Sequence, residues 1–226
     1  GLKHIARDHG PASIGALGSP HATAEELHLL AKLVRGLGSE NIDHRLRHAD
    51  FRHDGGARWL GGPIAALSEL QRVLVVGSFL RKDHPLFAQR IRQAARKGAQ
   101  VTSLNAAHDD WLMPMARRIT AAPSRWLAEL ADIAFAVAQA KGVAALLPGQ
   151  AGEAAQAVAA SLLSGERKAV LLGNAAAQHP QASELLAVAQ WIGQSTGASV
   201  GFLGEAANSV GAQLVGALPG TGGLDA

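Results

Sequence analysis

Two short apolar runs, each closed by a glycine, constrain the fold more than any other feature of this sequence. They are Arg72–Gly77 and Lys168–Gly173. Runs that stay apolar at successive positions are typical of strands buried on both faces of a parallel sheet. Each run is followed by a His-Pro pair, His84-Pro85 or His179-Pro180, and then by apolar residues at helical spacing. The pattern predicts two matching strand–helix–strand crossovers.

Further signals mark where these helices begin and end. Asp83 is expected to cap the first crossover helix, and Gly98 and Gly197 are expected to end the two helices. The returning strands then fall at residues 100–104 and 198–203. Near the start of the chain, a strand at 12–17 precedes a helix at 24–37. The spacing of Thr23 and Glu26 at the start of that helix matches a capping box.

Two matching crossovers favour an α/β fold: a Rossmann-like, doubly wound, mostly parallel sheet with flanking helices. Apolar helices are also predicted at 123–140 and 151–163, and residues 43–62 lack periodicity and are expected to be loop. The stretch 142–152 contains several glycines and indicates a joint. We therefore expect a first α/β lobe at residues 1–142 and a second at 143–226. Both ends resemble cuts through a longer protein, so the chain is expected to be a fragment, truncated in its second lobe.

Composition excludes several classes of protein. The 226 residues include no cysteine, which excludes disulfides, thiolate ligands to iron–sulfur clusters and a cysteine nucleophile. Tyrosine is absent and the formal charge is only +3, without the basic and aromatic stripe of a nucleic-acid-binding surface. No run reaches the roughly 20 apolar residues that a membrane span needs. We expect neither nucleic-acid binding nor direct membrane insertion.

In open α/β sheets, ligands bind beyond the carboxyl ends of the strands. The residues expected there include Gly77, Ser78 and Phe79 after one strand, Asn105 after the next, and Gly173 with Asn174 after the third. None of these segments matches a dinucleotide-binding or P-loop motif. The Gly77-Ser78 pair offers backbone N–H groups for a phosphate, or alternatively forms a tight strand-to-helix turn.

A histidine-rich stretch runs from Asp43 to Asp54. His44 and His48 have the spacing to share a helical face and bind a metal, and with Asp50 they would suit a metal-dependent hydrolase. Arginines stand between them, however, and the glutamate that a zinc hydrolase uses as its base is missing. The alternative is a loop held together by Arg, Asp and His ion pairs. The serines lack the nucleophile-elbow motif, so no catalytic residue is predicted.

Three segments carry a family resemblance. They are Ser19–Glu26 with its helix through Gly38, the stretch Asn41–Phe51, and Ala207–Ala212. They resemble the molybdopterin oxidoreductase superfamily, which has an E-E-x-x-x-x-x-K-x-x-R helix followed by N-x-D-x-x-x-R. In their order and spacing they are most similar to the large iron–sulfur subunits of bacterial NADH–quinone oxidoreductase, respiratory complex I.

The departures from the active members of the superfamily are informative. The resemblance places Ala49 where formate dehydrogenase-like enzymes have a Cys or selenocysteine metal ligand, and a methyl group cannot coordinate a metal. Phe79 stands where those enzymes often have an Asn that helps to hold a guanine dinucleotide. Asn105 stands where they commonly have an Asp, and a neutral amide only partly replaces a carboxylate. The resemblance therefore implies a vestigial cleft and no cofactor in this chain.

By resemblance, the chain is a scaffold in the peripheral arm of complex I, on the cytoplasmic side of the membrane. Its partners would be the other subunits of that arm, with iron–sulfur clusters in the rest of its own subunit. The loop 43–54 and the helix 126–141 are the expected contact surfaces. The alternative is a fragment of a molybdopterin- or nucleotide-dependent oxidoreductase, formate dehydrogenase-like, with its metal ligand elsewhere.

Overall fold

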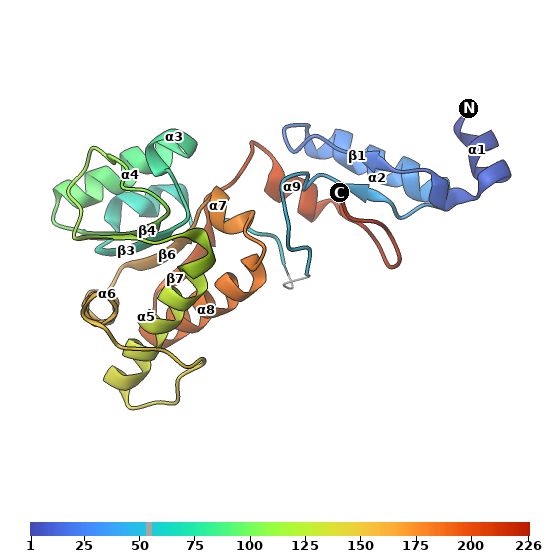
Figure 1. The fold of residues 1–226 in the computed structure, drawn as a ribbon. Coiled ribbons are helices and arrows are strands. Elements are labelled where there is room, and N and C mark those ends of the chain that lie inside the picture. The colour runs from blue at the N-terminus through green and yellow to red at the C-terminus, as the bar shows by residue number, and fades with distance from the viewer. Residues whose placement is uncertain (53–55) are drawn as a thin grey trace. The chain divides into compact units, whose positions relative to one another are not determined.

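A computed structural model describes residues 1–52 and 56–226. The chain forms two compact units (Figure 1): Gly1–Arg58 together with Gly204–Ala226 make the first, and Trp59–Leu203 make the second. The second unit holds both predicted crossovers, and the first holds the histidine-rich stretch.

A sheet of five parallel strands forms the centre of the second unit, in the order β5-β4-β3-β6-β7. The strands are β3 (Arg72–Val76), β4 (Gln100–Asn105), β5 (Arg117–Thr120), β6 (Lys168–Leu172) and β7 (Ser199–Phe202). From β3 the chain winds outward through β4 to β5, and from β6 it winds the other way to β7. This is the strand order of a doubly wound sheet, so the predicted fold class is confirmed.

Helices cover both faces of this sheet (Figure 1). One face carries α5 (Trp126–Lys141), α6 (Glu153–Leu163), α7 (Asn174–Ala177) and α8 (Ala182–Thr196). The other face carries η2 (Ile64–Glu69), α3 (Leu80–Asp83) and α4 (Pro85–Arg96). A short turn of 3-10 helix, η3 (Pro123–Arg125), precedes α5.

The apolar runs supply both cores because successive side chains of a strand point to opposite faces. Leu74 and Val76 of β3 lie in the core beneath α5, α6 and α8, whereas Val73 and Val75 lie in the core beneath α4. In the register of the sheet, Val73 is the neighbour of Val101 on β4 and of Ala169 on β6. An uninterrupted apolar run is therefore what this central position requires.

The two edges of the sheet differ. The backbone of residues 59–61 lies against the outer side of β7: Phe202 N–H donates to Trp59 O at 2.8 Å, and a side chain at Gly201 would collide with Leu60 O. The edge strand β5 was not predicted from the sequence. Its two arginines and its alternating exposure do not resemble the buried runs of β3 and β6. Charged side chains are common on edge strands, where they discourage pairing with other chains.

The first unit is smaller. It contains α1 (Leu2–His9), η1 (Pro11–Ser13), α2 (Ala24–Gly36), α9 (Ser209–Leu214) and a two-stranded parallel sheet of β1 (Ala16–Leu17) and β2 (Ile42–Asp43). The capping box is confirmed, since Glu26 N–H donates to Thr23 Oγ1 at 3.2 Å and Thr23 N–H donates to Glu26 Oε2 at 2.8 Å. Among the described residues of this unit, a core cluster contains Leu27, Val34 and Ile42.

Three expectations about strand, cap and domain boundaries need correction. The strand expected at 12–17 is shorter, because η1 takes its first part and leaves only Ala16–Leu17 in β1. Asp83 does not cap α4, whose N-cap residue is His84. It ends α3 instead, and its carboxylate accepts the Phe79 N–H at 3.1 Å.

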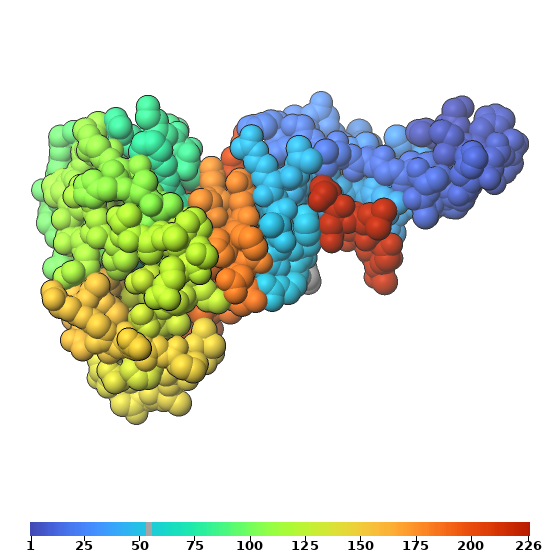
Figure 2. Space-filling model, in the orientation of Figure 1, coloured from blue at the N-terminus to red at the C-terminus, as the bar shows by residue number. Residues whose placement is uncertain are grey.

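The third correction concerns the boundary expected after Gly142. That position lies inside the second unit, because β3 and β6, which were expected in different lobes, are neighbours in one sheet. The connection 142–152, yellow at the lower end of this unit in Figure 2, joins α5 to α6, and both helices pack in the same core. The compact units divide at Arg58/Trp59 and Leu203/Gly204 instead.

The two-faced core yields a first prediction. Leu74→Ala removes a fully buried side chain (0% exposed) from β3. It should lower the free energy of unfolding by about 2–5 kcal/mol, because it leaves a cavity beneath α5 and α6. Leu86→Ala, at a position 78% exposed on α4, is the control and should change stability by less than about 0.5 kcal/mol. Urea titration measures both, and equal effects would show that β3 is not central.

Candidate functional site

The strand order places a topological switch point between β3 and β6. The chain leaves β3 toward β4 and leaves β6 toward β7, on opposite sides. The carboxyl ends of β3 and β6 therefore flank the crevice where open α/β sheets bind ligands. Gly77 and Ser78 follow β3, and Gly173 and Asn174 follow β6. The structure thus brings together predicted site residues that are about a hundred positions apart in the sequence.

These two turns contact each other directly. Gly77 has a φ of +62°, and a Cβ built there would lie 2.6 Å from Ala176 N and 2.8 Å from Trp126 Cζ3. A Cβ at Gly173 would collide with the Cβ of Ser78. Ala175 N–H also donates to Gly77 O at 3.0 Å. Glycine is required at both positions because backbone from one turn fills the space beside the other.

Backbone N–H groups near the crevice have partners within the protein. Gly77 N–H donates to Leu104 O at 2.9 Å, and Gly173 N–H donates to Val76 O at 2.8 Å. Phe79 N–H donates to the carboxylate of Asp83. A phosphate at this turn would compete with these acceptors and would meet the negative charge of Asp83. The geometry favours the tight-turn interpretation of Gly77-Ser78 over the phosphate site.

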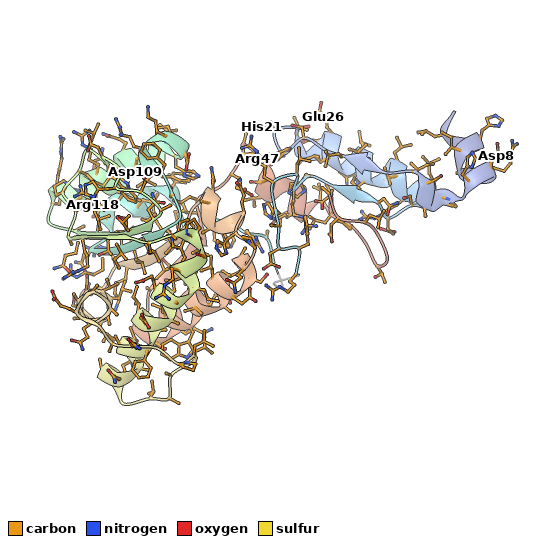
Figure 3. All side chains as sticks on the ribbon, viewed as in Figure 1. Asp8, His21, Glu26, Arg47, Asp109 and Arg118 are labelled. Atoms are coloured by element: carbon orange, nitrogen blue, oxygen red, sulfur yellow. The ribbon has the colours of Figure 1, made fainter. Side chains whose placement is uncertain are left out.

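Asn105, the last residue of β4, is hydrogen-bonded to the turn that follows β3. Its Nδ2 donates to Ser78 O at 3.1 Å and to Asp109 Oδ2 at 2.6 Å, and its Oδ1 accepts the Ala106 N–H at 3.0 Å. Asp109 is labelled in Figure 3, on the loop that follows β4. An amide suits this position because it donates to two oxygens at once. A carboxylate here would face a carbonyl and a second carboxylate.

Two histidines, His84 and His179, contact residues of this site. They were not predicted as site residues, although each belongs to one of the two His-Pro pairs in the sequence. His84 and His179 are both buried. The ring of His84 lies 3.4 Å from Ser78 Oγ, and His179 Nε2 lies 3.0 Å from Pro123 O. His179 also stacks on Trp126, with ring centroids 5.8 Å apart. Both histidines are packed beneath the turns, in positions that fix the backbone.

Asn174 is the polar residue of the site without a complete set of partners. Its side chain is half-buried, and its Oδ1 is buried with no hydrogen-bond partner among the residues that the structure describes. Phe79 is half-buried and begins the turn into α3. The resemblance associates an Asn at position 79 with binding of a guanine dinucleotide. Phe79 has no amide in its side chain, and Asn174 lies on a different turn.

The two histidines considered as metal ligands, both in the first unit, have other partners. His44 Nδ1 lies 2.9 Å from Ala217 O, and His48 Nε2 lies 2.6 Å from Glu205 Oε2. Among residues 1–52 and 56–226, no group of three His, Cys, Asp or Glu side chains converges on a possible metal position. His53 and Asp54 lie outside the described residues. Ala49 is exposed in a loop. The metal-dependent hydrolase interpretation finds no geometric support here.

Ion pairs order this loop instead. Arg45 pairs with Asp43 at 2.9 Å, and Arg52 pairs with Asp50 at 2.7 Å. Burial alone would raise the pKa of Asp43, but hydrogen bonds and the charge of Arg45 outweigh it and hold the pKa below its usual value. Arg47, labelled in Figure 3, is exposed. These contacts support the alternative of an ion-pair loop.

The helix expected to offer a contact surface is largely buried. Eight of the 16 residues of α5 are buried, among them Trp126, Leu130 and Val137. They pack between the sheet and the helices α6 and α8. The expectation that the helix 126–141 forms a contact surface is therefore wrong, because its apolar residues belong to the core.

Comparison with known proteins shows the family. The molybdopterin oxidoreductase family matches residues 1–225. The chain therefore belongs to the molybdopterin oxidoreductase family, as the sequence resemblance implied. Among the described helices, none has the length and apolar character needed to cross a bilayer.

Curated relatives match over shorter stretches. A probable oxidoreductase, YjgC, of Bacillus subtilis is 32% identical over 98 residues, which are 40% of this chain and 10% of that protein. The alpha subunit of an NADPH-Fe(3+) oxidoreductase of Geobacter sulfurreducens is 31% identical over 115 residues, 48% of this chain and 14% of that protein. A putative formate dehydrogenase of Staphylococcus aureus is 28% identical over 103 residues, 41% of this chain and 10% of that protein. The matched stretches thus span only 10–14% of these relatives.

A solved structure is similar over more of the chain. It is the formyltransferase/hydrolase complex of Methylorubrum extorquens with methylofuran, with a TM-score of 0.50 and 16% identity. The match covers 90% of this chain and 57% of that one. At this identity the likeness concerns the fold alone.

The Asn105 contacts yield a second prediction. Asn105→Asp should lower the free energy of unfolding at pH 7 by about 2–4 kcal/mol, because it replaces two donated hydrogen bonds with repulsion. Burial beside Asp109 raises the folded-state pKa of the new carboxyl, so the loss should shrink as the pH falls and the group is protonated. Asp109→Asn in the same chain is the matched control and should restore part of the stability. A loss that does not depend on pH would contradict this account of the site.

The buried His44 yields a third prediction, for the first unit. Burial lowers the pKa of His44 below its usual value. The unfolded chain then binds a proton near pH 6.5 that the folded chain binds only at lower pH. The free energy of unfolding should therefore fall as the pH drops below about 6.5, by at most about 1.4 kcal/mol per pH unit. Urea titrations followed by NMR signals of residues 14–44 measure this slope.

His44→Gln should flatten that slope, and His28→Gln, at an exposed position on α2, is the control that should leave it unchanged. An equal slope in the protein with and without His44 would show that another group titrates.

Proposed function

We propose that this chain is a non-catalytic structural domain of a molybdopterin-family oxidoreductase subunit. The observation that carries the proposal is the contact between the turns after β3 and β6, where Gly173 abuts Ser78 and Gly77 abuts Ala176. The two turns thus pack against each other at the switch point, where a nucleotide-bearing cofactor would be expected to bind. In this proposal the domain keeps the family fold and serves as a structural part of a larger assembly.

The residues at the crevice do not fit the family's cofactor. The N–H groups of Gly77, Phe79 and Gly173 have protein acceptors, and one of these acceptors is the carboxylate of Asp83. Asn105 uses its amide to join Ser78 to Asp109. In the other unit, the methyl group of Ala49 offers no ligand atom at the position that the resemblance assigns to the metal ligand. We assign no redox step to these residues.

Residues of the family's N-x-D-x-x-x-R stretch hold the chain together, which fits a scaffold. Asn41 Oδ1 accepts the Leu224 N–H at 2.9 Å, and Asp43 Oδ2 accepts the Ala226 N–H at 3.1 Å. Arg45 also pairs with Asp225 at 3.1 Å. These side chains fasten residues 224–226 to β2 within the first unit, so the motif has a structural use that needs no cofactor.

The assembly that we propose is the peripheral arm of a bacterial NADH–quinone oxidoreductase. The order and spacing of Ser19–Glu26, Asn41–Phe51 and Ala207–Ala212 support it. In that setting the partners are the other subunits of the arm, and the iron–sulfur clusters lie outside these residues. The chain would lie on the cytoplasmic side of the membrane and would support electron transfer from NADH to quinone without carrying it.

A second candidate is a structural subunit of a complex for formyl transfer and hydrolysis. The contact between the turns is equally compatible with this candidate, because formyl transfer and hydrolysis move no electrons and need no molybdopterin. The Methylorubrum extorquens complex shows that a chain with a similar fold occurs in such an assembly. The two candidates share the scaffold role and differ in their partners.

Cofactor analysis of the intact protein, purified with its natural partners, tests the scaffold role and is the fourth prediction. We expect less than about 0.1 molybdenum or tungsten atom per chain, and no pterin or guanine nucleotide released on denaturation, because the two turns pack against each other at the switch point and the N–H groups of Gly77 and Gly173 already have protein acceptors. A catalytic formate dehydrogenase analysed in parallel is the positive control. Stoichiometric pterin would overturn the proposal and favour the enzyme alternative.

Identification of the co-purifying subunits separates the two assemblies. NADH dehydrogenase subunits together with NADH–quinone reductase activity support complex I, whereas formyltransferase subunits support the second candidate. Recovery of the chain alone, without partners under mild conditions, would count against both.

A further inference from the structure

The opposite end of the same sheet carries a cationic depression. It lies at the amino ends of β3 and β6, away from the switch point, and has a volume of about 360 Å³. Its polar side chains include Arg72 at the start of β3, Lys97 after α4, and Arg167 just before β6. Three elements that are distant in sequence thus bring three cations to one place. No motif in the sequence marks this position.

Among the described residues, the side chains of Arg72 and Arg167 donate hydrogen bonds only to neutral oxygens. Arg72 donates from Nε to Ser164 Oγ at 2.9 Å and from Nη1 to Gln71 O at 2.9 Å. Arg167 donates from Nε to Glu69 O, a backbone carbonyl, at 2.6 Å. Within the part of the chain that the structure describes, no carboxylate pairs with either guanidinium. Nη2 of Arg72 and both terminal nitrogens of Arg167 keep their N–H groups for another acceptor.

Gln71 orders the loop beneath these cations. Its Oε1 accepts the Glu166 N–H at 2.7 Å and the Arg167 N–H at 3.4 Å. Because the amide oxygen is engaged, the Nε2 group of Gln71 provides two further N–H donors at the depression. The loop that carries Arg167 is therefore tied to the start of β3.

One carboxylate opposes the cations. Glu69 lines the depression, and its Oε1 lies 3.6 Å from Lys97 Nζ. Both side chains are well exposed, 58% for Glu69 and 67% for Lys97, so solvent screens their attraction. The three cations outnumber the carboxylate, which leaves an excess of two positive charges among the lining residues.

We propose that this depression binds a small molecule bearing a phosphate or diphosphate group. A guanidinium fork pairs with two phosphate oxygens at once, and an ammonium group adds a point charge beside it. Two excess positive charges match a phosphate dianion, and the volume is within the range of small-ligand sites. The site lies at the end of the sheet opposite the closed crevice, so it goes beyond the scaffold role and does not depend on it.

Calorimetric titration of the purified protein with pyrophosphate, and separately with inorganic phosphate, tests the proposal. We expect saturable binding of pyrophosphate with a dissociation constant of about 1 mM or tighter in low salt. Inorganic phosphate should bind more weakly because it presents fewer oxygens. Binding should weaken as the ionic strength rises from about 0.05 to 0.2 M, because the cations are exposed.

Two substitutions with opposite expected effects form the fifth prediction. Arg167→Gln should weaken pyrophosphate binding by about fivefold, because it removes a guanidinium fork. Glu69→Gln should tighten binding by about twofold, because it removes the opposing carboxylate while leaving the backbone carbonyl that Arg167 contacts. Arg118→Gln on the edge strand β5 is the matched control for the loss of one positive charge and should have no effect.

Loss of folding cannot mimic this pattern, since one variant must bind more tightly than the unmodified protein. Absence of saturable binding up to about 20 mM would overturn the proposal. So would binding that Arg118→Gln weakens as much as Arg167→Gln does. Cofactor content is unaffected by any of these results, so failure here is distinguishable from failure of the scaffold proposal.

Discussion

The contact between the turns that follow β3 and β6 is the constraint on which the second unit depends. These strands are neighbours at the centre of the sheet, and the chain turns outward from both. At the switch point, Gly77 and Gly173 allow the two backbones to meet with no side chain between them. Trp126 of α5 and Ala176 of α7 pack on this junction. In doubly wound folds, ligands bind in the crevice beside such a switch point.

The structural role that we propose rests on side chains that hold the turns and the chain end in place. The amide of Asn105 and the carboxylate of Asp83 take positions beside the turns and satisfy backbone groups there. In the first unit, Asn41 and Asp43 bind the backbone of residues 224–226. Residues of the family motif therefore have a structural use within the first unit.

Most helices and strands could be predicted from short stretches of sequence. The candidate site depends on contacts between segments that are distant in the sequence, and these could not be predicted. The apolar runs of β3 and β6, the capping box at Thr23 and the helix end at Gly197 are local signals, and each has the predicted structure. The strand β5 was missed because an edge strand need not be apolar. The boundary after Gly142 was misplaced because pairing of β3 with β6 joins segments about a hundred residues apart.

The candidate site shows the same division. The sequence identified Gly77, Ser78, Asn105, Gly173 and Asn174 from their places after strands, and the structure brings them together. It did not reveal that Gly173 abuts Ser78, because a glycine gives the same signal in a phosphate loop and in a close packing contact. Nor did it show that Asp83 would turn toward the Phe79 N–H rather than cap α4.

The proposal that this switch point binds no nucleotide is tested most directly by an NMR titration with GDP, which carries the guanine and diphosphate groups of a guanine-dinucleotide cofactor. The readout is the amide signals of Gly77, Ser78 and Gly173, because these report the switch point and not the cationic depression. These signals should stay unchanged up to about 1 mM GDP, whether or not GDP binds near Arg72 and Arg167. Saturable shifts of the Gly77 and Gly173 amides at micromolar GDP would contradict it.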